Sequence, residues 1–136
     1  MAAQLGFEAN LPLSFDAAVA RVTEALKNEG FGVLTRIDVH DTLKQKIGVD
    51  FRPYVILGAC NPQLAHQALS ARGEVGVMLP CNVTVEAASA DTSLVRIADP
   101  EMMMTVGDLG SDAVLQQVGS EARARLLRVV ESLRAS

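Results

Sequence analysis

The chain has 136 residues, enough for one domain that buries its own core. Apolar residues make up 49% of it and charged residues 21%, a composition typical of globular rather than disordered proteins. The formal net charge is −4, so we expect no general affinity for nucleic acid or for an anionic membrane surface.

The beginning of the chain, residues 1–7, lacks a basic segment followed by an apolar one, so we expect no signal peptide. The longest apolar stretches are too short to span a bilayer. We therefore expect a cytoplasmic protein without a membrane segment. The two cysteines of such a protein are expected to be reduced at rest.

The first third of the chain predicts two strands with a helix between them. Residues 4–11 are expected to form the first strand. Ser14 is a typical helix N-cap, apolar residues then recur at helical spacing, and Gly30 marks the end of that helix. Residues 32–39 are expected to form the second strand.

The middle of the chain continues with a short helix that Asp41 is expected to cap. Residues 53–59 are almost wholly apolar, which indicates a central strand covered on at least one face. The dipeptide 61–62, Asn-Pro, then has the pattern of an N-cap followed by a first-turn proline, and predicts a helix to about Ala71. Residues 75–87 are expected to form the next strand.

The last part of the chain begins with a return strand at residues 93–98 and a short helix after Asp99. Ser111 is then expected to cap a long helix in which Gly119 is the weak point. Its apolar stripe comprises positions 114, 115, 118, 122, 126, 129, 130 and 133. This helix is expected to close the layer or to pack against a second subunit.

The order of these elements predicts the fold class. Strands and helices follow as β-α-β-β-α-β-β plus a C-terminal helix, with a short helix after the second strand. We therefore expect an α/β (α+β) two-layer sandwich, with a mixed β-sheet and helices on one face. The chain is expected to form a single domain, with an α/β core at residues 1–107 and a C-terminal helical extension at residues 108–136.

The cysteines lie in matching contexts, Cys60-Asn61 and Cys81-Asn82. Each dipeptide adjoins an apolar run and has a proline within two residues. If the strands around them are neighbours, the two thiols share one edge of the sheet. The candidates for ligand binding or redox chemistry are therefore Cys60, Asn61, Cys81 and Asn82, and a soft metal ion would be bound by Cys60 and Cys81.

Cys60 is expected to be the more reactive thiol, because it directly precedes the N-terminus of a helix, whose dipole lowers the pKa of a thiol. The structural alternatives stay open. A small cysteine also fits a crowded turn, Asn61 is explained by helix capping, and Asn82 can form a hydrogen bond across the sheet. Neither His40 nor His66 belongs to a spaced ligand motif.

Four blocks of sequence, at residues 30–39, 42–44, 50–62 and 79–83, occur in one order. Together they resemble the domain-of-unknown-function family numbered three hundred and two, over about residues 4–105. The resemblance implies a compact two-layer α/β domain, often paired into dimers, and implies no established activity. We therefore expect a homodimer, and the helix after residue 110 to lie outside the family's core.

Three functions remain open at this point. The first is a binding module for a small ligand or a soft metal at Cys60 and Cys81. The second is a thiol-dependent redox protein or sensor that uses Cys60 with Cys81. The third is a structural or interaction protein whose cysteines only pack. Whether the protein is an enzyme stays open with them.

Overall fold

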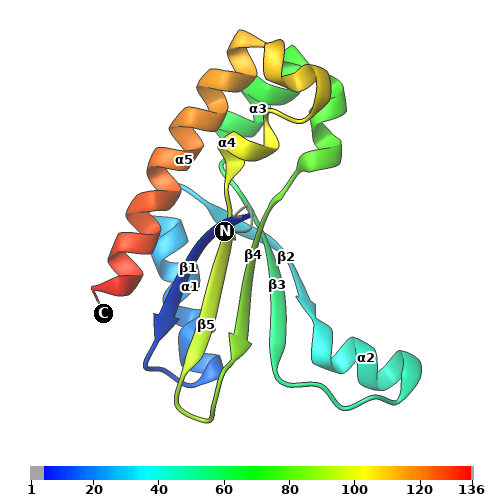
Figure 1. Ribbon diagram of the computed structural model, residues 1–136, viewed down its shortest axis with the longest axis vertical. Coiled ribbons are helices and arrows are strands. Elements are labelled where there is room, and N and C mark those ends of the chain that lie inside the picture. The colour runs from blue at the N-terminus through cyan, green and yellow to red at the C-terminus, as the bar shows by residue number, and fades with distance from the viewer. Residues whose placement is uncertain (1–4, 136) are drawn as a thin grey trace.

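A five-stranded antiparallel sheet, in the order β1-β5-β4-β3-β2, supports helices packed on one of its faces (Figure 1). The computed structural model describes residues 5–135. The strands are β1 (Gly6–Leu11), β2 (Gly32–Asp38), β3 (Tyr54–Cys60), β4 (Cys81–Ala87) and β5 (Ser93–Ala98). The helices are α1 (Phe15–Asn28), α2 (Val39–Ile47), α3 (Pro62–Ala71), α4 (Pro100–Met103) and α5 (Ala113–Arg134), with the 3-10 segments η1 (Gly73–Met78) and η2 (Gly107–Ser111).

The two-layer α+β class is confirmed, but the sheet is antiparallel throughout rather than mixed. The sequence suggested parallel pairs because helices separate most strands. In the structure α2 and α3 lie beyond the ends of the strands that they connect, so the chain turns back into the adjacent strand (Figure 1). A parallel pair would need a helix that crosses over a face of the sheet.

Three boundaries differ from the predictions. Residues 73–78 form η1, and β4 begins at Cys81, because Pro80 has no N–H group to donate to the ladder. The N-cap of α2 is Asp38 and not Asp41, so this helix begins earlier than expected. α5 is capped by Asp112, whose Oδ1 accepts from the backbone N–H of Val114 at 2.9 Å and of Leu115 at 3.1 Å.

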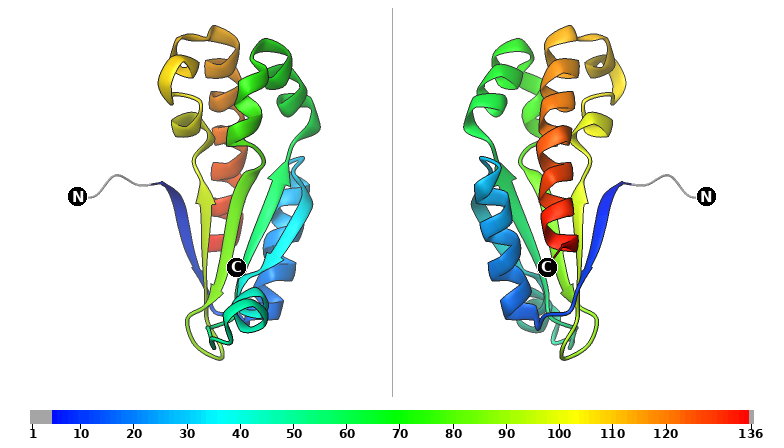
Figure 2. Two further views of the ribbon diagram at one scale, coloured as in Figure 1. Left: turned by 90° about the vertical axis from the view of Figure 1, so that its right-hand side faces the viewer. Right: turned by 90° about the vertical axis from the view of Figure 1, so that its left-hand side faces the viewer.

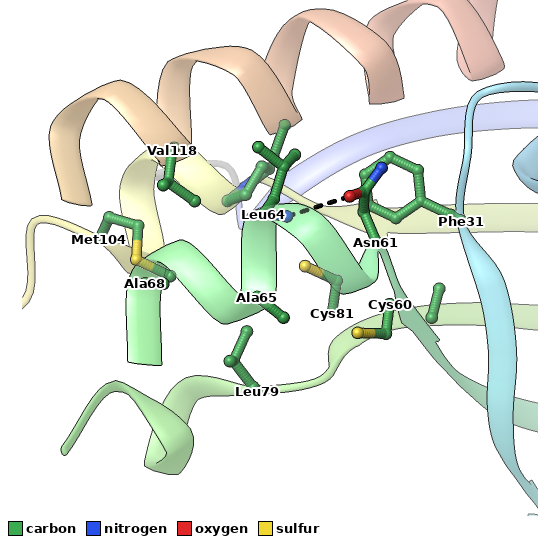
Figure 3. Close-up of a pocket in the computed structure, with 14 residues that line it drawn as sticks. Phe31, Cys60, Asn61, Leu64, Ala65, Ala68, Leu79, Cys81, Met104 and Val118 are labelled. Atoms are coloured by element: carbon green, nitrogen blue, oxygen red, sulfur yellow. Dashed lines mark hydrogen bonds between the residues drawn. The ribbon is translucent and has the colours of Figure 1, made fainter. Parts of the chain in front are cut away.

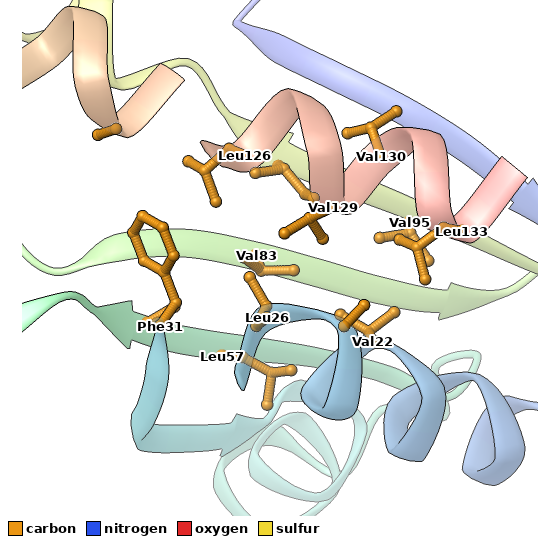
Figure 4. Packing of buried hydrophobic residues seen from close by; sticks show 14 of the residues in the cluster. Val22, Leu26, Phe31, Leu57, Val83, Val95, Leu126, Val129, Val130 and Leu133 are labelled. Atoms are coloured by element: carbon orange, nitrogen blue, oxygen red, sulfur yellow. The ribbon is translucent and has the colours of Figure 1, made fainter. Parts of the chain in front are cut away.

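The core lies between the sheet and the pair α1 and α5, which cover the same face (Figure 2). Side chains from both helices meet those of the central strands there (Figure 4). In α5 the buried residues are Leu115, Val118, Gly119, Ala122, Leu126, Val129, Val130 and Leu133. The predicted stripe is therefore largely buried within its own chain, and each fully buried Leu or Val contributes roughly 1.5–3 kcal/mol.

The upper end of the molecule is helical. α3, η1, α4, η2 and the first half of α5 gather beyond the end of the sheet (Figure 1). α4 crosses α5 at Gly119, where a Cβ atom would lie 3.2 Å from the Cα of Glu101 and 3.2 Å from the Cγ of Met104. The glycine that weakens the sequence pattern of α5 is thus a point where the two helices approach each other closely.

Within residues 5–135 no helix covers the second face of the sheet, and this face is charged. Glu86 is buried there at 7% exposure. Its carboxylate accepts hydrogen bonds from Arg52, with Nε to Oε2 at 2.5 Å, and from Arg96. Arg96 also donates from Nε to Glu8 at 2.9 Å, so a network of ion pairs spans β1, β5 and β4. Among the described residues, no helix is both long and apolar enough to cross a bilayer.

Candidate functional site

The two cysteines lie at the same end of two adjacent strands. β3 ends at Cys60, α3 begins two residues later, and β4 begins at Cys81. Cys81 pairs directly with Ala59 in the antiparallel register, so the cysteines are one register position apart. The condition for a shared edge, that the two strands are neighbours, is therefore met. Both cysteines are free, and no disulfide joins them.

A small pocket of about 30 Å³ brings both thiols together (Figure 3). It lies where the sheet gives way to the helical end, and its walls come from β3, α3, β4, α4 and α5. Most of the lining is apolar, including Leu64, Ala65, Leu79 and Val118. Figure 3 shows the sulfur atoms of the two cysteines beside Ala65.

The two thiols enter the pocket from different faces of the sheet. Side chains alternate along a strand, so Cys81 shares the covered face with its partner Ala59, and Cys60 belongs to the opposite face. Cys81 is buried at 7% exposure, whereas Cys60 is partly exposed. The matching sequence contexts therefore conceal two different environments.

Burial sets the acidity of both thiols. It raises the pKa of Cys60 above the usual value for cysteine. For Cys81, burial and then the nearby charge of Cys60 raise the pKa to about 11. Both thiols are therefore protonated at neutral pH, and the lowered pKa that we expected for Cys60 is wrong.

The helix N-terminus explains part of this difference. The amide oxygen of Asn61 accepts a hydrogen bond from the backbone N–H of Leu64 at 3.1 Å. The predicted N-cap is thus confirmed, and it satisfies one of the donors that could otherwise have stabilised a thiolate. Desolvation of the partly buried Cys60 is what raises its pKa.

The two asparagines also lie in different environments. Asn61 is buried at 7% exposure and lines the pocket. Asn82 is exposed, pairs with Gly58 on the second face of the sheet, and does not line the pocket. The structure therefore brings together three of the four candidate residues: Cys60, Asn61 and Cys81.

The thiols have few polar neighbours that could complete a metal site. Within residues 5–135, no three His, Cys, Asp or Glu side chains are grouped so that they could hold a metal ion. Any metal held in this pocket would rely on Cys60 and Cys81 as its charged ligands. This donor set does not suit Zn²⁺, whose structural sites use four nitrogen or sulfur ligands.

Sequence reasoning missed the far wall of the pocket. Met104, Val118 and Ala122 line it from α4 and α5, more than twenty residues beyond Cys81. The one local signal was Gly119, because its missing side chain lets α4 approach α5 and so positions Met104.

A larger polar cleft, of about 710 Å³, opens at the opposite end of the sheet. His40 lines this cleft. Its Nδ1 accepts a hydrogen bond from the backbone N–H of Tyr54 at 3.1 Å. Arg36 and Asp38 form an ion pair at 3.0 Å in the same cleft. These polar groups are thus engaged with one another or with the backbone.

Comparison with known proteins identifies relatives of the chain. It is similar to the structure described as "Crystal structure of uncharacterized conserved protein DUF302 from Bacillus stearothermophilus". The TM-score is 0.83 at 31% sequence identity, over 97% of this chain and 100% of that chain. No curated protein matches.

A family model, described as the domain of unknown function DUF302, matches residues 7–133. The match extends through α5, so the expectation that the resemblance ends near residue 105 and leaves this helix outside is wrong. The burial of the α5 stripe against α1 and the sheet gives the physical reason, because the domain has no closed core without it. The chain therefore belongs to the DUF302 family.

Proposed function

We propose that this domain is a binding module that holds a small ligand or a soft metal ion in the pocket beside Cys60 and Cys81. The observation that carries the proposal is that both thiols line one pocket whose walls come from five separate elements. Packing alone would not require both cysteines of the chain at one pocket. An apolar recess with a few polar groups is also the usual form of a small-molecule site.

The acidity of the thiols favours binding over redox chemistry. Reactivity of a cysteine follows its thiolate fraction. With a pKa of about 11, Cys81 would be ionised in roughly one molecule in ten thousand at pH 7. The pKa of Cys60 is also raised, so neither thiol is poised for nucleophilic attack.

The size of the pocket limits the ligand. A volume of about 30 Å³ exceeds what one water molecule requires, but it is far below the several hundred Å³ of a typical cofactor site. The ligand is therefore a single atom, an ion or a molecule of very few heavy atoms. An apolar lining favours a ligand that gives up its hydration easily.

Xenon is a suitable neutral probe, because it enters dry apolar cavities and needs no chemical reaction. We expect dissolved xenon to shift the backbone amide NMR signals of residues 59–64 in a saturable manner. Ala65→Leu should abolish these shifts by filling the pocket. Ala17→Leu, an exposed position on α1, is the matched control and should leave them unchanged.

A different xenon result would contradict binding of a small neutral ligand. Equal xenon shifts in the wild type and in Ala65→Leu, or no saturable shift at all, would show that the pocket does not accept a small neutral ligand. The binding proposal would then hold only for a metal ion.

Homodimer formation is a further part of the proposal, and it rests on the dimers that the family resemblance implies. The α5 stripe no longer supports it, because that stripe is buried on its own sheet. Sedimentation equilibrium over a range of protein concentrations measures the mass directly. A single species with the monomer mass at every concentration would contradict this part.

A further inference from the structure

The side chains around the pocket point to a specific class of ligand. Cys60 and Cys81 reach it from adjacent strands and from opposite faces of the sheet, and Figure 3 shows both sulfur atoms beside Ala65. Both side chains line the same pocket of about 30 Å³. Two soft donors are therefore available to one bound atom.

The coordination number distinguishes between metals. Two thiols without a converging His, Asp or Glu among the described residues provide a two-ligand site. Zn²⁺ prefers four such ligands, and hard cations prefer oxygen. Thiolate donors select Cu(I), and monovalent cations with a filled d shell accept two ligands in a line.

The charge of such a complex also fits its surroundings. A monovalent cation with two thiolates carries a net charge of −1. The N-terminus of the ten-residue helix α3 follows Cys60 directly, and its dipole favours negative charge.

We propose that this pocket binds one monovalent d¹⁰ cation, Cu(I) or its analogue Ag(I), between Cys60 Sγ and Cys81 Sγ. The inference rests on the proposed binding function of the pocket and names its ligand class. Two S–H bonds break, two sulfur–metal bonds form, and two protons leave to solvent. The metal keeps its oxidation state, so no oxidant or reductant is required.

Proton release makes the affinity depend on pH. Free thiols carry their protons near neutral pH, and a bound metal takes the thiolate form. The affinity therefore rises as the pH rises, by up to about 100-fold per pH unit while both pKa values lie above the pH. A site that used one thiol would rise by at most about tenfold per unit.

Ag(I) is the probe for the decisive experiment, because it does not change oxidation state in air. Reduced full-length protein is titrated with silver nitrate in chloride-free buffer, with a soluble thiol as competitor. We expect one Ag(I) per chain, release of two protons, and an affinity that increases between pH 6 and pH 8. Cys60→Ser and Cys81→Ser should each bind at least about 100-fold more weakly.

The controls separate folding from binding. Asn82→Ala changes the exposed neighbour of Cys81 and should bind Ag(I) like the wild type. Cys81→Ala keeps a small apolar side chain in the buried position, so it tests the thiol if Cys81→Ser fails to fold. Zn²⁺ alone should bind at least about 100-fold more weakly than Ag(I).

Each outcome bears on one proposal or on both. Ag(I) bound as tightly by Cys60→Ser as by the wild type, or more than one Ag(I) per chain, would overturn the two-thiol site. If xenon occupies the pocket and Ag(I) does not, the cation inference fails and the proposed binding function stands. If neither probe binds, both fail.

Discussion

The two faces of the sheet differ in almost every physical respect. The face under α1 and α5 is aliphatic and buried, as Leu57 and Val83 illustrate (Figure 4). The other face carries the ion pairs of Glu86 with Arg52 and Arg96. Successive residues of β3 and β4 therefore alternate between two environments, so neighbours in the sequence contribute either to the apolar core or to the charged face.

The cysteines show what this difference implies. In sequence they are equivalent, but Cys81 belongs to the covered face and Cys60 to the other one. They meet because the pocket lies at the end of the sheet, where side chains from both faces can reach the same space. A site at a sheet end can thus combine a buried donor with a more accessible one.

The largest expected effect concerns two neighbours in β3. Leu57 is 1% exposed on the covered face, and Leu57→Ala should lower the free energy of unfolding by about 2–5 kcal/mol. Ile56, on the other face and partly exposed, is the matched control, and Ile56→Ala should cost about 1 kcal/mol. Urea denaturation measures both. Equal losses would mean that something covers the second face.

Glycine substitutions give the next largest effect. A Cβ on Gly58 would lie 2.2 Å from Thr35 Oγ1 and 2.8 Å from Pro80 Cγ, so Gly58→Ala should cost about 1–3 kcal/mol. Gly32 in the adjacent strand has no such neighbour within 4 Å, and Gly32→Ala should leave stability nearly unchanged. A Gly58→Ala protein that melts at the wild-type temperature would contradict the close packing of this face.

The ion pairs of the second face predict a smaller, pH-dependent effect. Burial by itself raises the pKa of Glu86, but hydrogen bonds from Arg52 and Arg96 outweigh it and hold the pKa below its usual value. The stability that this carboxylate contributes is therefore present at neutral pH and lost as the pH falls through the lowered pKa.

Glu86→Gln tests this directly. We expect a loss on the order of 1 kcal/mol at pH 7, because both arginines are partly exposed. The difference between variant and wild type should shrink on acidification, measured as unfolding free energy from pH 7 to pH 3. A constant difference would show that the charge of Glu86 contributes nothing. Glu8→Gln, at the exposed end of the network, is the control and should have less effect.

The smallest effect on the fold is expected from thiol labelling. Cys60 is partly exposed and Cys81 is buried, so N-ethylmaleimide should modify Cys60 first near pH 7.5. The rate of Cys60 should also rise with pH, because its pKa is raised. Peptide mapping over time gives both rates. Equal rates in the folded protein would contradict the separation of the two environments.

Local patterns predicted much of this fold. The helix at Asn61-Pro62 and the long apolar stripe of α5 both follow from residue type and spacing. Each depends on interactions within a few residues or on burial of one face, which periodicity reports directly.

The remaining features depend on contacts between distant residues. The antiparallel register assigns Cys60 and Cys81 to different faces, and no local pattern fixes that register. Met104 reaches the pocket because of the crossing at Gly119. The raised pKa values follow from burial in the finished fold, which the sequence contexts of the thiols do not report.

The position of β1 at the edge of the sheet has a consequence for biosynthesis. Gly6 pairs with Ala98, and Arg134 donates from Nη2 to the backbone oxygen of Glu8 at 2.7 Å. β1 therefore cannot complete its pairing until β5 has been synthesised, and its contact with the end of α5 forms later still. Pairing between such distant residues adds non-local contacts, which slow folding.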